Sequence, residues 1–546
     1  MNKYKKLLSL LLVCNIGIFS ITGCNQSNIS SDNTNTSENN VVKTDYTASI
    51  QTDHTQIEFD DEDLIDSYNK DTCTIINLSG KTNEITSPGT YLISGTIDDG
   101  NIQVNSSSKG TVRLIFNGVN ITSDDAAPVL ISDASKVIIT LVSGTQNIIT
   151  DNRPASLEDD YSGAISSKAD LVINGTGKLE VNGNYRNGIK SSDDLKIVSG
   201  DYTITSSEDG IVGKNCLCIK DGTFSINAGD DGMKSTYDTD DTKGYVIIEN
   251  GTYNITSGND GIQSEHSLTI YGGTFSLSSG DDGIHADELI QIDNGRITIN
   301  KCYEGIESAV ININGGDISV TSSDDGLNAS DGSTPSLNIN GGKLYVNASG
   351  DGLDSNGTMS ISGGEVIVEG PTDNGNTALD FERTLTITGG TVYAFGSSGM
   401  LETPSSASNG CCIVTTFSTI NGNESFTLKD SSGNIIISYT PSKSYSAAII
   451  YSQDIKSNTE YTIIAGSNSV SITTNEGVTS NAANGGFGQG GRGGSQKGLM
   501  PDGSSGSQGN MPEMPGAGTD GQQIVPENHG NMPDRQGKYQ GAPGNL

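Results

Sequence analysis

A short phrase recurs along this chain about every 22 residues, and it constrains the fold more than any other feature. The phrase is a polar pair that is often acidic, then Gly, an apolar residue that is usually branched, any residue, and a small residue. Its glycines are separated by 22, 22, 29, 22, 22, 21 and 26 residues and are Gly188, Gly210, Gly232, Gly261, Gly283, Gly305, Gly326 and Gly352. A fixed period of this size is typical of a solenoid, in which each coil of chain stacks on the one before.

Each repeat carries two further runs in which apolar residues alternate with other residues. An example is Leu268-x-Ile270 and Phe275-x-Leu277, with Gly272-Gly273 between them. Alternation between Gly-rich turns predicts strands, and the turn glycines supply the positive φ that sharp corners need. No helical half-repeat is present, which excludes a leucine-rich repeat. The sequence therefore predicts an all-β chain that forms a right-handed parallel β-helix with three strands per coil.

The first residues have the pattern of an export signal. A basic stub that ends at Lys6 precedes a short apolar run, which is too short for a membrane-spanning helix. Ile21-Thr22-Gly23-Cys24 resembles a bacterial lipobox, which implies that Cys24 is lipidated and anchors the exported protein to the membrane surface. The alternative is an ordinary signal peptide with a chance cysteine.

Composition divides the rest of the 546-residue chain into five segments. After a signal over 1–24, we predict a flexible Ser/Asn/Thr-rich tether over 25–50 and divergent N-terminal β coils over 51–160. The regular repeats span 161–397, a small antiparallel β cap spans 398–475, and a disordered Gly/Pro/Gln/Asn-rich tail spans 476–546. A cap is expected because a bare terminal coil is an open sheet edge that invites aggregation.

Stacking places the acidic residues of the phrase above one another. Adjacent coils are about 4.8 Å apart, so their carboxylates repel unless water, amides or cations offset the charge. Oxygen ligands in such clusters suit Ca²⁺. The predicted calcium ligands are Glu208, Asp209, Asp230, Asp231, Asp260, Asp281, Asp282, Glu304, Asp324, Asp325, Asp351 and Asp354. The alternative is that these acids are turn residues that bond their own turn backbone, which Asn187 and Asn259 in equivalent positions support.

A second column consists of the outward residues between the inward apolar and small residues of the phrase. It is basic at its amino-terminal end and acidic at the other, and it reads Lys190, Val212, Lys234, Gln263, His285, Glu307, Asn328 and Asp354. The predicted ligand-binding face is made by Lys190, Lys234, Gln263, His285, Glu307 and Asn328. The alternative is an ordinary solvated face.

Other residue types narrow the range of functions. A formal net charge of −36 disfavours nucleic acid as a partner. Cys216 and Cys218 share one face of a strand, and we interpret them as strand residues because no second pair lies at zinc spacing. Trp is absent, which leaves Tyr345 and Tyr393 as outward aromatics for sugar stacking or as scattered surface tyrosines. We expect a monomer.

The phrase, together with Ser87–Thr96 and Val112–Val119, resembles a clostridial family of carbohydrate-binding domain-containing surface proteins. The resemblance covers residues 75 to about 475. It implies a calcium-bearing β-helix that binds acidic plant polysaccharide such as polygalacturonate, with cellulose as a further candidate and no established hydrolysis. Asp351-Gly352-Leu353-Asp354 also looks like the calcium-binding coil of one class of pectate lyases, which is an analogy of fold.

Three functions remain open from the sequence. The first is a lipid-anchored, non-catalytic binder of acidic polysaccharide that uses calcium. The second is a calcium-dependent lyase of the pectate-lyase type, for which Lys190 and Lys234 are the candidate bases. The third is a surface adhesin or envelope protein without a sugar ligand. A hydrolase is disfavoured because no Gly-His-Gly or Arg-x-Lys motif occurs.

Overall fold

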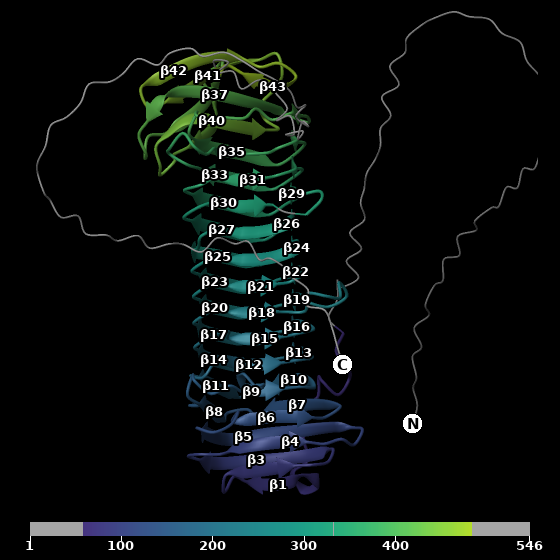
Figure 1. Ribbon diagram of the computed structural model, residues 1–546. Coiled ribbons are helices and arrows are strands. Elements are labelled where there is room, and N and C mark those ends of the chain that lie inside the picture. The colour runs from purple at the N-terminus through teal and green to yellow at the C-terminus, as the bar shows by residue number, and fades with distance from the viewer. Residues whose placement is uncertain (1–57, 331, 483–546) are drawn as a thin grey trace, which may run out of the picture. The chain divides into compact units, whose positions relative to one another are not determined.

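The computed structural model describes residues 58–330 and 332–482. In this part of the protein the chain winds through parallel strands that stack one coil on the next (Figure 1). Equivalent residues of successive coils lie opposite each other, as Ile189 does with Ile211 and Ile211 with Met233. This pairing confirms the predicted parallel β-helix. The predicted signal, lipid-anchor cysteine and tether lie outside the described residues, as does most of the predicted tail.

The strands form three parallel stacks, and the long strands β3, β5, β24 and β26 each contribute to two of them. The first stack carries the recurring phrase and contains β2 (Thr82–Ile85), β4 (Asn101–Asn105), β6 (Val129–Asp133), β9 (Gly163–Ser167), β12 (Asn187–Ser191), β15 (Ile211–Gly213), β18 (Met233–Ser235), β21 (Ile262–Ser264), β24 (Ile284–Ile292), β26 (Ile306–Ile313), β28 (Leu327–Ala329) and β31 (Leu353–Ser355).

The second stack contains β1 (Thr74–Asn77), β3 (Gly89–Ile97), β5 (Thr111–Ser123), β7 (Lys136–Leu141), β10 (Asp170–Gly175), β13 (Asp194–Ile197), β16 (Cys216–Ile219), β19 (Tyr245–Ile248), β22 (Ser267–Ile270), β29 (Ser336–Ile339), β32 (Thr358–Ile361), β34 (Thr384–Ile387) and β36 (Ser406–Ala407). The third stack contains β8 (Gln146–Asp151), β11 (Lys178–Gly183), β14 (Asp201–Ser206), β17 (Thr223–Ala228), β20 (Thr252–Thr256), β23 (Thr274–Ser278), β25 (Arg296–Lys301), β27 (Asp317–Ser322), β30 (Lys343–Ala348), β33 (Glu365–Glu369) and β35 (Thr391–Gly396).

Helical structure among the described residues is limited to one 3-10 turn, η1 (Lys70–Thr72). None of the helices in that part of the chain has the length and hydrophobicity needed to span a membrane.

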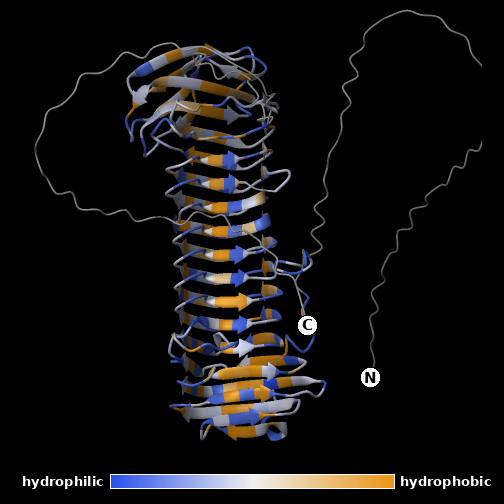
Figure 2. Ribbon diagram, viewed as in Figure 1, coloured by the Kyte–Doolittle hydropathy of each residue, from blue (hydrophilic) through white to orange (hydrophobic). Residues whose placement is uncertain are grey.

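The core is the interior of the coil, where the three stacks face one another. Its residues come from alternate positions of each strand, so hydrophobic and hydrophilic colours mix along most strands (Figure 2). Tyr202, Phe224, Tyr253 and Phe275 stack face to face inside the third stack, with ring centroids 4.5–4.9 Å apart. The two tyrosine hydroxyls donate to the carbonyls of Ser199 and Asn250 at 2.7 Å, which satisfies them in the core. Cys216 and Cys218 are buried residues of β16, as predicted.

The glycine of the recurring phrase is required by close packing between coils. A Cβ atom at Gly210 would lie 2.4 Å from the carbonyl oxygen of Gly232, and one at Gly283 would lie 2.6 Å from that of Gly305. The turn glycines have a different role, since Gly273 and Gly342 adopt φ of 107° and 79°. Both reasons for glycine follow from the coil geometry, but only the second was predicted from the sequence.

We expect Gly283→Ala to destabilise the protein by about 1–3 kcal/mol, because the new methyl group overpacks a backbone contact that cannot rotate away. Its Cβ would also meet Ile299 Cδ1 at 2.7 Å. Gly375→Ala is the control, since a Cβ there meets only the Asp373 side chain, at 3.2 Å. Denaturant unfolding of both variants checks this, and equal midpoints would contradict it.

The carboxyl-terminal end of the stack is covered by antiparallel strands. β40 (Tyr445–Ser452) pairs antiparallel with both β35 and β37 (Cys411–Ile420), and β43 (Gly477–Ser480) pairs parallel with β37. A separate sheet contains β38 (Phe426–Asp430), β39 (Ile435–Tyr439), β41 (Glu460–Ala465) and β42 (Asn468–Thr473). This confirms the predicted antiparallel β unit, which ends at Ser480, beyond the predicted limit near residue 475.

A buried carboxylate joins this unit to the coils. The Tyr439 hydroxyl donates to Oε1 of Glu369 at 2.6 Å, and the Ser442 N–H donates to Oε2 at 3.0 Å. The ring of Tyr393 lies 6.3 Å from that of Tyr439. Tyr393, one of the two predicted outward aromatics, therefore packs against the cap.

At the other end, residues 58–69 form no strand and cross the outside of the coils instead. Lys136 Nζ lies 2.8 Å from Asp63 Oδ1, and Lys196 Nζ donates to the carbonyl oxygen of Glu58 at 2.8 Å. The coils themselves begin at β1, so the divergent segment after residue 74 is part of the same stack.

Candidate functional site

The acids that precede the phrase glycines form one column along the first stack. The side chains of Asp209, Asp231, Asp260, Asp325 and Asp351 accept hydrogen bonds from the backbone of the next coil. The N–H of Asp231 donates to Oδ1 of Asp209 at 3.3 Å, that of Asp260 to Asp231 at 2.9 Å, and that of Asp282 to Asp260 at 2.9 Å. The N–H of Asp351 continues the pattern to Asp325 at 2.6 Å. We call this the carboxylate ladder.

The ladder revises the turn-residue interpretation. The acids do bond backbone amides, but the amides belong to the next coil and not to their own turn. Asn187 begins the ladder in the same way, because its Oδ1 accepts from the N–H of Asp209 at 3.1 Å. One oxygen of each bonded side chain is therefore used structurally. The second carboxylate oxygen has different partners along the ladder, since Oδ2 of Asp231 pairs with Lys234 and Oδ2 of Asp282 pairs with His285.

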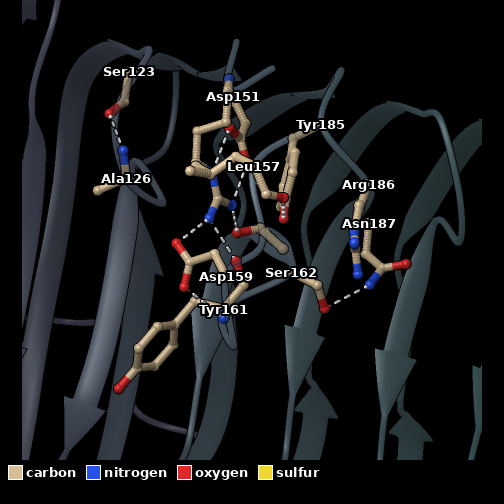
Figure 3. A network of polar contacts seen from close by, with 12 residues as sticks. Ser123, Ala126, Asp151, Leu157, Asp159, Tyr161, Ser162, Tyr185, Arg186 and Asn187 are labelled. Atoms are coloured by element: carbon tan, nitrogen blue, oxygen red, sulfur yellow. Dashed lines mark hydrogen bonds and ion pairs between the residues drawn. The ribbon is translucent and has the colours of Figure 1, made fainter. Parts of the chain in front are cut away.

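A network of polar contacts supports the amino-terminal end of the ladder (Figure 3). The Asn187 amide donates to Ser162 Oγ at 3.1 Å, and the Tyr185 hydroxyl donates to the Leu157 carbonyl at 2.6 Å. The guanidinium of Arg153 lies 4.2 Å from the centre of the Tyr185 ring and pairs with Asp151 at 2.6 Å. Both members of this ion pair are fully buried.

Lys234 neutralises the amino-terminal part of the ladder. Its Nζ lies 2.9 Å from Asp209 Oδ1 and 2.8 Å from Asp231 Oδ2. Burial alone would lower the pKa of Lys234, but the charges and hydrogen bonds of the two carboxylates outweigh it and raise that pKa. Asp230 lies close enough to both carboxylates for the three to share one cation. Lys234 already fills that position.

Lys190 lies two coils before Lys234 and has different surroundings. Burial is the main reason that its pKa is lowered, and the positive charges of Lys234 and Arg186 lower it further. A lysine with a lowered pKa is a better base than one held in ion pairs. Lys190 is therefore a better candidate than Lys234 for the base of a lyase.

The central part of the ladder has a histidine where the earlier coils have lysine. His285 Nδ1 lies 3.1 Å from Asp282 Oδ2 and 2.9 Å from Glu307 Oε2, and its Nε2 lies 3.2 Å from Asp287. Burial opposes the charged form, but these three carboxylates raise the pKa of His285 to about 12. Two groups of possible cation ligands meet here, Asp260 with Asp282 and His285, and Asp282 with Glu304 and Glu307.

Farther along, the carboxylates have no basic partner. The structure places no Lys or Arg of the described residues within 4.0 Å of Glu304, Asp351 or Asp354. Burial is the main cause that raises the pKa of Glu304 to about 8 and that of Asp354 to about 7. Neighbouring acids add to both shifts, through Glu307 for Glu304 and through Asp380 for Asp354.

Asn328 supplies an unpaired oxygen at the same place. Its amide nitrogen donates to Glu304 Oε2 at 2.9 Å, while its buried Oδ1 has no hydrogen-bond partner. Asn328 is 9% exposed and lies opposite Glu307 on one side and Asp354 on the other. An orphaned carbonyl oxygen beside protonation-prone carboxylates fits a hard cation such as Ca²⁺, which takes six to eight oxygen ligands.

The outward residues of the first stack form one column, as predicted. Lys190 lies opposite Val212, Lys234 opposite Gln263, and Glu307 opposite Asn328. Val212 is fully buried, and β15 is the uniformly hydrophobic strand between the mixed colours of β12 and β18 in Figure 2. Because these residues form one column in the structure, the column changes from basic to acidic along the stack, as the sequence predicts.

The outer acids, predicted as a second set of ligands, have more varied surroundings. Arg186 Nε lies 3.7 Å from Glu208 Oε1, and Asp324 accepts a hydrogen bond from the Tyr303 side chain. Asp230 joins Asp209 and Asp231 in the neutralised part of the ladder. Asp281 lies in the turn directly before Asp282. The structure thus gives the outer acids no common role.

Two acids that the sequence reading missed extend the acidic end. Asp380 follows Asp354 in the outward column, because Leu353 bridges to Leu379. Glu402 lies near Asp380, and burial followed by the Asp380 charge raises its pKa to about 7. The signal for Asp380 was a degenerate phrase, Thr377-Ala378-Leu379-Asp380, in which Ala replaces Gly. Glu402 lies outside any repeat, so the period gives no signal for it.

Part of the chain matches a family of known proteins. Residues 79–326 match the carbohydrate-binding domain-containing protein family. This confirms the resemblance to that family over residues 79–326. A relative from Acetivibrio thermocellus with the same description is 39% identical over 143 residues, which are 26% of this chain and 50% of that protein. The chain thus spans about half the length of that relative.

A solved structure is also similar. It is described as the polysaccharide lyase-like protein from C. thermocellum, in a gadolinium derivative. It is 33% identical to this chain, covers 40% of this chain and 95% of its own, and superposes with a TM-score of 0.39.

Proposed function

We propose that this protein binds acidic polysaccharide, such as polygalacturonate, through calcium held at the acidic end of the carboxylate ladder, and that it performs no chemistry on it. Asn328 carries the proposal, since its buried Oδ1 is unpaired, its amide nitrogen bonds Glu304, and Asp354 opposite it has no Lys or Arg partner among the described residues. The family match at residues 79–326 supports carbohydrate as the ligand class. Cys24, outside the described residues, is the proposed lipid anchor at the membrane surface.

Calcium reconciles an acidic surface with an acidic ligand. The chain carries a formal charge of −36, so a polyanion is repelled unless a metal inverts the charge locally. Glu304 with Asn328, and farther along the ladder Asp351 with Asp354, are the residues that would hold calcium ions. When bound, Ca²⁺ supplies positive charge and open coordination positions for sugar carboxylates.

The test is retention of the protein on polygalacturonate beads in calcium and in chelator. We expect retention in calcium only, because the ladder needs the cation to attract a polyanion. The variant Glu304→Gln/Asp354→Asn should lose at least tenfold in affinity, by analogy with loss of metal ligation. Asp317→Asn/Glu365→Gln is the control, because it removes the same charge from exposed acids on the third stack.

A second function, lyase activity, is favoured by one observation, the lowered pKa of the Lys190 amine. Incubation of polygalacturonate with the protein and calcium at high pH, followed by the ultraviolet band of the unsaturated product, separates the two. We expect no product. Product that is lost in Lys190→Gln would replace the binder by the lyase. A polymer that is neither retained nor cut would favour the adhesin instead.

A further inference from the structure

Four lysines gather beside the amino-terminal end of the ladder. Lys168 directly follows β9, Lys190 is the outward residue of β12, and Lys214 directly follows β15. Lys243 lies in the loop before β19, next to Gly244, whose N–H donates to the Asn215 carbonyl at 2.6 Å. Together these residues form a patch across successive coils, which we call the lysine patch.

The lysine patch lacks the ion pairs that neutralise most other lysines of the stack. Among the described residues, no carboxylate lies within 4.0 Å of the Nζ of Lys168, Lys190, Lys214 or Lys243. Asp193 and Asp240 interact with Lys243 only beyond that distance. Lys168 and Lys214 are exposed. In a chain where 66 acids face 30 bases, four lysines without such a partner leave positive charge unneutralised on this face.

Aromatic rings orient the ammonium groups of the patch. Lys214 Nζ and Lys243 Nζ lie 5.2 and 4.5 Å from the centre of the Tyr237 ring. Lys168 Nζ lies 4.5 Å from the centre of the Tyr161 ring, which points away from Asp151, Leu157 and Tyr185 in Figure 3. These distances are those of cation–π contacts, which limit the freedom of a lysine without neutralising its charge.

We propose that the lysine patch is a second subsite for an acidic oligosaccharide and binds its carboxylates directly, without a metal ion. The proposal rests on acidic polysaccharide being the ligand. Charge complementarity supports it, since an anion would neutralise ammonium groups that have no carboxylate of the described residues within ion-pair distance. The face then has two chemistries along its length, direct ion pairs at the amino-terminal end and cation bridging at the acidic end.

The test measures binding of oligogalacturonate to the full chain in chelator, where only the lysine patch is active. We expect weak binding that falls with added salt, because exposed ion pairs are screened. Lys214→Gln/Lys243→Gln should weaken it about fivefold to tenfold, the range for two exposed pairs. Lys109→Gln/Lys301→Gln removes the same charge from lysines outside the patch and should leave binding unchanged. Fully methyl-esterified oligogalacturonate should not bind, because it lacks the carboxylates.

The outcomes separate the two proposals. Binding in calcium that the patch variant leaves intact, with none in chelator, would overturn the second subsite and preserve the proposed function. Binding in chelator that both double variants weaken equally would also overturn it, because the effect would then be one of net charge. Absence of binding in both conditions would overturn the proposed function itself. Sulfated oligosaccharide of the same length tests whether carboxylate is required or any anionic sugar suffices.

Discussion

In the absence of calcium, the protein should lose stability as the pH rises from 5 to 8.5. Burial raises the folded-state pKa of Asp260 to about 7, of Asp351 to about 7 and of Glu304 to about 8. A carboxyl group with a raised pKa contributes stability below its unfolded value near 4, and that stability is lost as the pH passes through the folded value. The combined loss is on the order of 5 kcal/mol after allowance for screening.

Calcium should reverse this dependence, because a bound cation favours the ionised carboxylates. Thermal melting in chelator and in calcium, each at several pH values, should therefore give curves that diverge as the pH rises. Parallel curves would contradict the prediction and leave the acids as structural ladder residues only. Below pH 5 other groups determine how stability depends on pH. One of them is Glu307, whose pKa is lowered to about 2 by its hydrogen bond to His285.

Asp260→Asn isolates one group of the ladder. The amide can still accept from the N–H of Asp282, a bond of 2.9 Å, but it no longer titrates. In chelator we expect this variant to be more stable than the parent at pH 8.5 and similar to it at pH 5. Asp201→Asn changes an acid outside the ladder, so its stability should equal that of the parent at both pH values.

Arg153→Met should be among the most destabilising single substitutions in this chain. The guanidinium and its partner Asp151 are both 0% exposed, and Arg153 also pairs with Asp159 at 2.7 Å. Removing one member of a buried pair leaves an uncompensated charge and costs about 3–5 kcal/mol. Chemical denaturation measures the loss directly.

Two comparisons test this explanation. Arg383→Met removes an exposed guanidinium and should cost less than about 0.5 kcal/mol. Adding Asp151→Leu to Arg153→Met should recover part of the lost stability, since an apolar pair avoids the buried charge. A single variant that loses less than about 1 kcal/mol would mean that water reaches Asp151 and restores its solvation.

The fold followed from the sequence because the repeat is close to regular. A period near 22 residues with alternating apolar positions leaves one arrangement that buries Ile189, Ile211 and Met233 in one row. The cap strands were also recognisable, since their alternation persists after the period ends. The path of residues 58–69 could not be predicted, because a segment without periodicity gives no signal for the surface that it crosses.

The site was predicted only in part, since spacing shows which residues share a column but not what each side chain contacts. The sequence placed Asp209 and Asp231 in one column but did not show that Lys234 forms ion pairs with both of them. It placed Lys190 on the ligand-binding face but missed Lys168, Lys214 and Lys243, because the contact of Lys214 with Tyr237 depends on how the longest repeat folds its extra residues. Asp380 was not predicted because Ala378 stands in the position of the phrase glycine.

The bonds of the carboxylate ladder join only neighbouring coils, so the length of the stack can change by whole coils. A coil that contributes a side-chain acceptor to the next amide needs nothing from coils farther away, so whole coils are the natural unit of gain or loss. Each added coil lengthens the face by about 4.8 Å. If the protein binds polysaccharide as proposed, the length of polymer that it follows is set in discrete steps by the number of repeats. The two or three outward residues of each coil then determine the surface chemistry of that step.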